Sequence, residues 1–287
     1  MADLAAGQLA LKNGDYATAL TEPLPLAQQG NAPAQFFVGF MYHEGYGVPQ
    51  DYVEAARWCR LAAEQGDAGA QVNLGLTYHS GNGVPQDDRE AVRWFRLAAE
   101  QGDAEGQFDL GDCYQKGEGV IRDDKEASRW YRLAAEQGDV SAQFSLGRLY
   151  YDGQGVPQNY KEAMKYFRSA AEHGKASAQF SLGVMYYQGQ SVPQDYNEAL
   201  RWYRLAAEQG LSVAQVNLGV MYASGRGVPR DDVQAHMWSN LAVASGNVDA
   251  IKLRDKIAEG MTPGQVDEAQ RRAREWTEKR AATRAPQ

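Results

Sequence analysis

Cysteine and histidine are scarce in this chain, and their scarcity excludes two classes of protein. The 287 residues include two cysteines, Cys59 and Cys113, and four histidines. Two cysteines cannot form the dense disulfide framework of a small secreted domain, and these two lack the paired spacing of a zinc module. The sequence therefore predicts neither kind of protein.

Long apolar runs and an excess of basic charge are also missing. No stretch reaches the roughly 18 apolar residues that would predict a transmembrane segment. The formal net charge is -8, which disfavours nucleic acid as a partner because neutralising phosphates requires clustered Lys and Arg. The first residues lack a basic stretch followed by an apolar core, so we expect no signal peptide.

Short motifs recur along most of the chain at a constant spacing. Glycine recurs every 36 residues, at Gly30, Gly66, Gly102, Gly138, Gly174, Gly210 and Gly246. A fixed period of this length is typical of stacked supersecondary units. We predict six repeats, at 31–66, 67–102, 103–138, 139–174, 175–210 and 211–246. An atypical capping repeat at 1–30 and C-terminal capping helices with a frayed tail at 247–287 complete the predicted organisation.

Each repeat carries two helical patterns and no strand-type alternation. Ala142–Tyr151 is an example of the first, helix A, and Asp195–Gln209 of the second, helix B. Gly-x-Gly followed by Val-Pro ends helix A, because Gly adopts the left-handed conformation easily and Pro cannot continue a helix. Asp or Asn followed three residues later by Glu or Gln is the pattern of a capping box and opens helix B. The pattern predicts an all-α fold of antiparallel helix pairs.

Several residue types recur at the same place in every repeat. Trp or Tyr in helix B and Tyr in helix A predict the core, and a Gly inside helix A predicts close helix contact. A recurrent Gln predicts a hydrogen bond between helices, and Arg with Glu four residues on predicts an ion pair along helix B. Cys59 stands where other repeats have Phe95, Tyr131, Phe167 and Tyr203. We interpret Cys59 and Cys113 as small core residues and not as reactive thiols.

Taken together, one repeat resembles a known family. The segments Ala-Gln-x-x-Leu-Gly-x-x-Tyr, Gly-x-Gly-Val-Pro-Gln-Asp-Tyr and Glu-Ala-x-x-Trp-Tyr-Arg-x-Ala-Ala-Glu-Gln-Gly are similar to the Sel-one-like repeat, a relative of the tetratricopeptide repeat. The resemblance implies a right-handed α-solenoid and a non-catalytic adaptor, without cofactor, that binds proteins. We expect a monomer, periplasmic or secreted if the chain is a mature form and otherwise cytoplasmic.

The variable columns of helix A are the candidate binding surface. Residues three and four apart share one helical face, and the resemblance places that face on the concave side of the solenoid. The predicted groove residues are Phe37, Phe40, Asn73, Leu76, Asp109, Asp112, Ser145, Arg148, Ser181, Val184 and Asn217. The groove would be apolar at its N-terminal end and acidic in the middle. We therefore expect a peptide or helix with an apolar anchor and a basic group. The alternative is that these surface positions vary without any binding role.

Other functions find weaker support. An enzyme such as a cell-wall or β-lactam hydrolase would need a nucleophile motif, and neither Gly-x-Ser-x-Gly nor Ser-x-x-Lys occurs. A metal sensor built on His43 and His79 with help from Glu44 is a further alternative, but equivalent atoms of adjacent repeats lie roughly 10 Å apart, too far for one ion. The basic segment after Pro263 fits a solvated cap, with docking to an acidic partner or a membrane surface as the alternative.

Overall fold

The computed structural model describes residues 3–284, which form helices α1 to α17 and contain no β-strand. The chain divides into two compact units, Met1–Gln158 and Asn159–Gln287. We call them unit 1 and unit 2 and describe each by itself.

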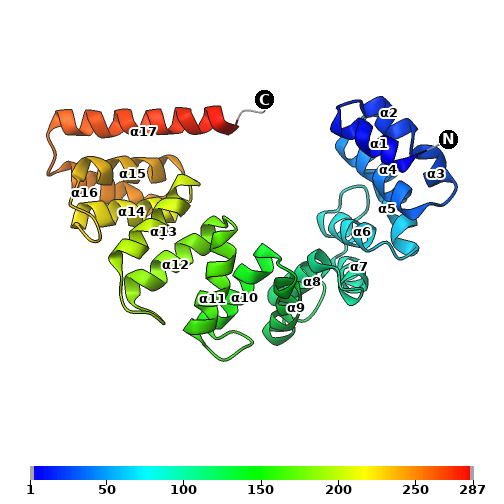
Figure 1. Ribbon diagram of the computed structural model, residues 1–287, viewed down its shortest axis with the longest axis horizontal. Coiled ribbons are helices and arrows are strands. Elements are labelled where there is room, and N and C mark those ends of the chain that lie inside the picture. Colours follow the sequence, from blue (N-terminus) through cyan, green and yellow to red (C-terminus); the bar gives the residue numbers. More distant parts are fainter. Residues whose placement is uncertain (1–2, 285–287) are drawn as a thin grey trace. The chain divides into compact units, whose positions relative to one another are not determined.

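Twelve helices of nearly equal length alternate along the repeats (Figure 1). The A helices are α4 (Ala32–Glu44), α6 (Ala68–Ser80), α8 (Ala104–Lys116), α10 (Val140–Asp152), α12 (Ala176–Gln188) and α14 (Ser212–Ser224). The B helices are α5 (Tyr52–Glu64), α7 (Asp88–Glu100), α9 (Asp124–Glu136), α11 (Tyr160–Glu172), α13 (Tyr196–Glu208) and α15 (Asp232–Ala244). Inside each unit, every helix of these repeats packs against its neighbours in the chain. The predicted all-α fold of helix pairs is confirmed.

The turn after each A helix begins with a left-handed residue, as predicted. Gly45 has a φ of 73°, and the second turn glycine, Gly47, has a φ of 75°. A Cβ on Gly47 would lie 2.4 Å from the carbonyl oxygen of Tyr16, so this position also needs the close approach that Gly allows. Ser191 fills the same column in a later repeat and adopts a φ of 67°.

The start of each B helix corrects one detail of the prediction. Asp51 Oδ1 accepts the backbone N–H groups of Val53 and Glu54, at 2.9 and 3.1 Å, as an N-cap should. The N–H of Asp51 donates to the carbonyl of Tyr42 at 3.0 Å, while Glu54 pairs with Arg57 at 2.8 Å. The N-cap is confirmed, but the reciprocal half of the capping box is wrong because the turn brings another acceptor to that N–H.

The mid-helix glycines are sites of close contact between A and B helices. A Cβ on Gly75 would lie 2.5 Å from the ring of Phe95, and one on Gly111 would lie 2.8 Å from the ring of Tyr131. Phe95 and Tyr131 are buried, as are Trp58, Trp94, Trp130, Trp202 and Trp238. The predicted role of these columns in packing is confirmed.

Two recurrent hydrogen bonds join neighbouring repeats. The buried Gln71 donates from Nε2 to the carbonyl of Ala63 in the preceding repeat at 3.1 Å and accepts from Gln101 at 2.7 Å. Arg60 donates from Nη2 to the hydroxyl of Tyr78 in the following repeat at 2.7 Å. The predicted Gln bond is confirmed. For the arginine, the predicted partner is wrong, because its side chain reaches a hydroxyl of the next A helix and not Glu64 on its own helix.

The two ends differ from the repeats. At the N-terminus α1 (Leu4–Lys12) is followed by α2 (Tyr16–Thr21) and α3 (Leu24–Gln28), which are separated at Pro23 as the prolines predicted. At the C-terminus α16 (Val248–Ala258) leads to α17 (Pro263–Arg284). The helix continues to Arg284, and the part of the predicted frayed tail at 285–287 lies outside the described residues.

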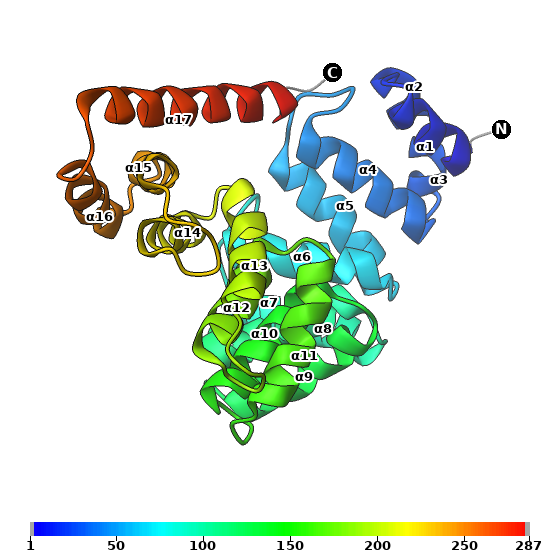
Figure 2. The ribbon, with the colours of Figure 1, turned by 60° about the vertical axis from the view of Figure 1, so that its left-hand side comes forward.

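The long α17 lies over α15 within unit 2 (Figures 1 and 2). Trp276 meets Trp238 edge to face with ring centroids 6.0 Å apart, and Ala269 and Ala273 are buried in the same core. Part of the basic face of this helix is paired within the helix, because Arg271 and Arg272 both contact Glu268, at 2.5 and 2.7 Å. These contacts support the interpretation of α17 as a solvated cap.

Candidate functional site

The predicted groove residues of unit 1 lie on α4, α6, α8 and α10, and all are exposed or half-buried. We call the surface that they form the A-helix face. Phe40 and Leu76 are the exposed large apolar residues on it, 37% and 39% exposed. Exposed apolar side chains next to a hollow are typical of contact sites.

A pocket of about 360 Å³ opens on the A-helix face between α4 and α6. We call it the α4–α6 pocket. It is lined by Phe36, Gly39, Phe40, His43, Glu44, Tyr52, Ala55, Cys59, Asn73, Leu76, Thr77, His79, Ser80 and Asn82. Three of the predicted residues, Phe40, Asn73 and Leu76, therefore meet at one hollow.

Phe37 does not line this pocket. It packs instead against the core formed with the N-terminal helices, which includes Leu11 and Leu24. Its ring lies 6.5 Å from that of Phe40, and Phe40 in turn lies 6.0 Å from Tyr46. Phe37 thus lies between the N-terminal core and the ring of Phe40.

Two histidines lie at the rim of the pocket, each beside its own carboxylate. His43 Nδ1 is 2.8 Å from Glu44 Oε1, and His79 Nδ1 is 2.8 Å from Asp88 Oδ1. Within residues 3–284, no group of three or more His, Cys, Asp or Glu side chains is placed to hold a metal ion. His43 and His79 therefore form part of a polar rim, and among the described residues they do not share a set of metal ligands.

The acidic part of the face centres on Asp109 in α8. Burial raises the pKa of Asp109 to about 7, helped by the negative charges of Glu105, Asp112 and Asp139 and opposed by His79. Its Oδ2 atom is buried and meets no hydrogen-bond donor among the described residues. A buried acceptor without a donor is costly, so this carboxyl is best satisfied by a proton or by an added cation.

Asp112 is held by its neighbours. Its Oδ2 lies 2.6 Å from Lys116 Nζ, and its Oδ1 lies 3.4 Å from the hydroxyl of Tyr131. On α10, Ser145 is half-buried and Arg148 is exposed. Unit 1 thus places an apolar pocket and an acidic patch on successive A helices.

The remaining predicted residues lie in unit 2. Ser181 donates from Oγ to the carbonyl of Ser177 at 3.0 Å, and Val184 packs beside the core of Tyr203 and Met221. Asn217 is half-buried on α14. A single groove through all six repeats stays a prediction.

The two thiols are buried and held neutral. Burial raises the pKa of Cys59 and of Cys113 to about 12 in each case. A thiol is a weak nucleophile until it ionises. The interpretation of both cysteines as core residues is therefore supported.

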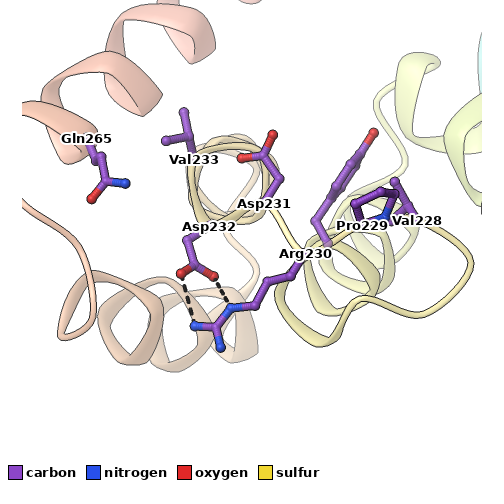
Figure 3. Close-up of a pocket in the computed structure, with 8 residues that line it drawn as sticks. Val228, Pro229, Arg230, Asp231, Asp232, Val233 and Gln265 are labelled. Atoms are coloured by element: carbon purple, nitrogen blue, oxygen red, sulfur yellow. Dashed lines mark hydrogen bonds and ion pairs between the residues drawn. The ribbon is translucent and has the colours of Figure 1, made fainter.

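A second hollow, of about 600 Å³, lies at the start of α15 in unit 2 (Figure 3). Its charged groups already have partners, since Arg230 pairs with Asp232 at 2.9 Å and Asp231 accepts the N–H of Gln234. Gln265, across from them on α17, caps its own helix through Thr262 at 2.9 Å. This hollow is therefore a weaker candidate for a binding site than the α4–α6 pocket.

The fold and the A-helix face define a helical repeat scaffold. The Sel1 repeat model matches residues 32–67, 68–103, 104–139, 140–175, 176–211 and 212–247. The chain therefore belongs to the Sel1 repeat family. A comparison with curated protein sequences found no match, and among residues 3–284 no helix is both long and apolar enough to span a membrane.

One solved structure agrees with this assignment. A Sel1 repeat protein from Oxalobacter formigenes is 36% identical, with a TM-score of 0.76 over 88% of this chain and 75% of that one. A protective antigen of uropathogenic Escherichia coli is 28% identical over 95% of this chain and 91% of that one, with a TM-score of 0.42. An immunity protein from Pseudomonas aeruginosa is 20% identical over 83% of each chain, with a TM-score of 0.45. The last two superpose too loosely to support any argument about a partner.

Sequence reasoning did not identify the pocket itself. Phe36, Gly39 and Cys59 line it, but the variable columns of helix A do not include them. The available signal was Cys59 itself, one of two departures from aromatic residues in its column beside Ser239, and we interpreted it as a packing change only.

Proposed function

We propose that this chain is a non-catalytic scaffold that holds a segment of a partner protein, as an extended peptide or a helix, on the A-helix face. The α4–α6 pocket carries the proposal. Its walls expose Phe40 and Leu76 to solvent around a concave, mostly apolar surface, and binding sites for side chains have this character.

The acidic patch supplies the second contact. Asp109 has a buried oxygen without a donor, and Asp112 adds a second carboxylate three residues on. A Lys or Arg side chain from the partner would donate to them, and charge-assisted bonds of this kind are strong and directional. The partner segment would therefore carry an apolar anchor and a basic residue.

Family membership favours binding over catalysis. Sel1 repeat proteins are generally non-catalytic and typically bind proteins. A catalytic alternative has a direct test, which is hydrolysis of a chromogenic β-lactam by the purified protein. Turnover that survives rigorous purification would contradict the proposal.

The binding proposal is tested with a random peptide library displayed on phage and selected on the purified chain. We expect enrichment of peptides that combine a large apolar residue with Lys or Arg. Phe40→Ala and Asp112→Lys should each weaken the selected peptides by at least about tenfold, a loss of about 1.4 kcal/mol. Leu61→Ala and Glu64→Lys make comparable changes on a B helix, the loss of an apolar side chain and the reversal of a carboxylate's charge, and should leave affinity unchanged.

The library result has a clear contrary outcome. If both folded A-helix variants bind the selected peptides as tightly as the unmodified chain does, the partner does not lie on the A-helix face.

A further inference from the structure

The α4–α6 pocket occupies the place that an aromatic ring fills in four other repeats, while the sixth repeat has Ser239 there. Phe95, Tyr131 and Tyr203 are buried at the helix B position equivalent to Cys59. A Cβ on the mid-helix glycine of the same repeat would lie 2.5 Å from the ring of Phe95, 2.8 Å from that of Tyr131 and 2.5 Å from that of Tyr203. In the first full repeat, the atom nearest to such a Cβ on Gly39 is the Sγ of Cys59, at 2.9 Å. A thiol leaves the volume of a ring unfilled.

A second aromatic residue shows how a ring would pack there. The ring of Phe108 lies 5.7 Å from that of Tyr131 with an interplanar angle of 34°. Phe180 and Tyr203 repeat this arrangement at 5.7 Å and 35°. Phe36 is the equivalent of Phe108 two repeats earlier, and it lines the α4–α6 pocket. Phe36 therefore stands at the position from which Phe108 and Phe180 contact a ring, and its own repeat does not provide that ring.

The rim of the pocket also has a polar group at the position where the ring of Tyr131 meets one. The hydroxyl of Tyr131 donates to Oε1 of Gln115 at 2.9 Å. The residue equivalent to Gln115 is His43, at the rim of the pocket. The pocket thus has an apolar side at Phe36 and a polar side at His43, just as the ring of Tyr131 has Phe108 on one side and Gln115 at its hydroxyl.

Resting on the proposed function, we infer that the α4–α6 pocket receives one aromatic side chain of the partner, which packs between Phe36 and Gly39 where four other repeats place a ring of their own. The partner's ring would complete the repeat. Offset aromatic pairs are favourable beyond the area that they bury, and a volume of about 360 Å³ accommodates one such side chain. The apolar interior disfavours a charged side chain, since burying a charge without a partner is costly.

The sharpest test fills the pocket with the ring that four other repeats carry. In Cys59→Phe the new side chain should occupy the pocket, raise the thermal midpoint and remove the binding site. Cys59→Ala is the matched control, because it also removes the thiol but leaves the pocket open. The probe is N-acetyl-phenylalanine amide, with N-acetyl-alanine amide as its non-aromatic counterpart, and the readout is the amide NMR spectrum of the full chain.

We expect saturable shifts at the amides of Phe36, Gly39 and Leu76 with the phenylalanine probe and none with the alanine probe. The Ala variant should keep these shifts, and Cys59→Phe should weaken binding at least about tenfold. Absence of saturable shifts in the unmodified chain, or unchanged binding by folded Cys59→Phe, would overturn the inference.

A second measurement covers the case in which Cys59→Phe does not fold. The phenylalanine probe should slow alkylation of Cys59 in the unmodified chain at pH 9, as followed by mass spectrometry, and should leave Cys113 unaffected. Equal rates at Cys59 with and without the probe would contradict a ring above the thiol.

The two proposals fail in different ways. If Phe40→Ala weakens the selected peptides while folded Cys59→Phe binds them normally, the A-helix face is the binding surface but the ring pocket is wrong. If Phe40→Ala and Asp112→Lys both leave the affinity unchanged, the proposed function itself fails.

Discussion

At the scale of one residue, Asp109 places a buried carboxyl on the A-helix face at a cost in stability. Its carboxyl is largely withdrawn from solvent, has three negative neighbours and leaves Oδ2 without a donor. Burial raises its pKa from the ordinary 3.8 to about 7. The folded chain therefore binds a proton between these pH values that the unfolded chain has already released.

The first prediction concerns pH and stability. Because the folded state holds the extra proton, raising the pH from about 4 to about 7 should lower the free energy of unfolding through Asp109, and the loss is complete above about 7. Asp109→Asn cannot ionise, so its advantage over the unmodified chain should grow across this window to roughly 2–4 kcal/mol. Chemical denaturation at pH 5 and pH 8 measures both.

The exposed Asp152 on α10 is the control, since Asp152→Asn removes the same charge without removing a buried group. An advantage of Asp109→Asn that does not increase with pH, or that Asp152→Asn shares, would contradict the burial of an unsatisfied carboxyl.

At the scale of the element, the start of helix B separates two interactions that the sequence pattern combines. Asp195 caps α13 by accepting the N–H groups of Asn197 and Glu198, at 2.9 and 3.1 Å. Its own N–H donates to the carbonyl of Tyr186 at 3.0 Å. Glu198 faces Arg201 at 3.5 Å instead. The cap should therefore depend on the aspartate and hardly on the glutamate.

The second prediction follows from this asymmetry. Asp195→Ala should lower the free energy of unfolding by about 1 kcal/mol, because it leaves two helix N–H groups without their acceptor. Glu198→Gln should cost only a few tenths of a kcal/mol, about the value of an exposed ion pair within a helix. Denaturant titration of both variants decides the matter, and equal losses would restore the reciprocal capping box.

At the scale of the whole molecule, contacts are made between neighbours. Recurrent bonds such as Arg60 to Tyr78 and Gln71 to Ala63 join each repeat to the next. In proteins built this way, stability is approximately a sum of repeat terms and nearest-neighbour terms. Damage at one end should then stay near that end.

The third prediction removes the C-terminal cap. Truncation before Thr262 takes away α17 and exposes Trp238 and the core around it. Hydrogen exchange followed by mass spectrometry should show faster exchange in α14, α15 and α16 and unchanged protection in α4 to α9. Trp276→Ala should give a weaker form of the same pattern, because it removes one contact of α17 and keeps the helix.

A uniform loss of protection over α4 to α15 after this truncation would mean that the repeats unfold as one cooperative body, and nearest-neighbour coupling would then be the wrong description.

Much of the fold was predictable because its signals are local. The glycine after each A helix, the Asp or Asn before each B helix and the prolines at 23 and 25 act through the backbone within a few residues. The columns of Trp58 and Gly75 were also readable, since a fixed period places equivalent residues in equivalent surroundings. On the candidate site, the sequence singled out Phe40, Leu76 and Asp109 as residues that the repeat does not require.

Only the tertiary structure decided which hydrogen-bond partner a side chain takes and where a pocket is left between the helices. Arg60 has Glu64 one turn away along its helix, yet it bonds Tyr78, and nothing in the sequence ranks the two. The α4–α6 pocket is the volume left when α4, α5 and α6 pack around Cys59 without a ring. Such a volume depends on where three separate helices come to lie, so the sequence determined which residue was unusual and the packing determined that it opens a site.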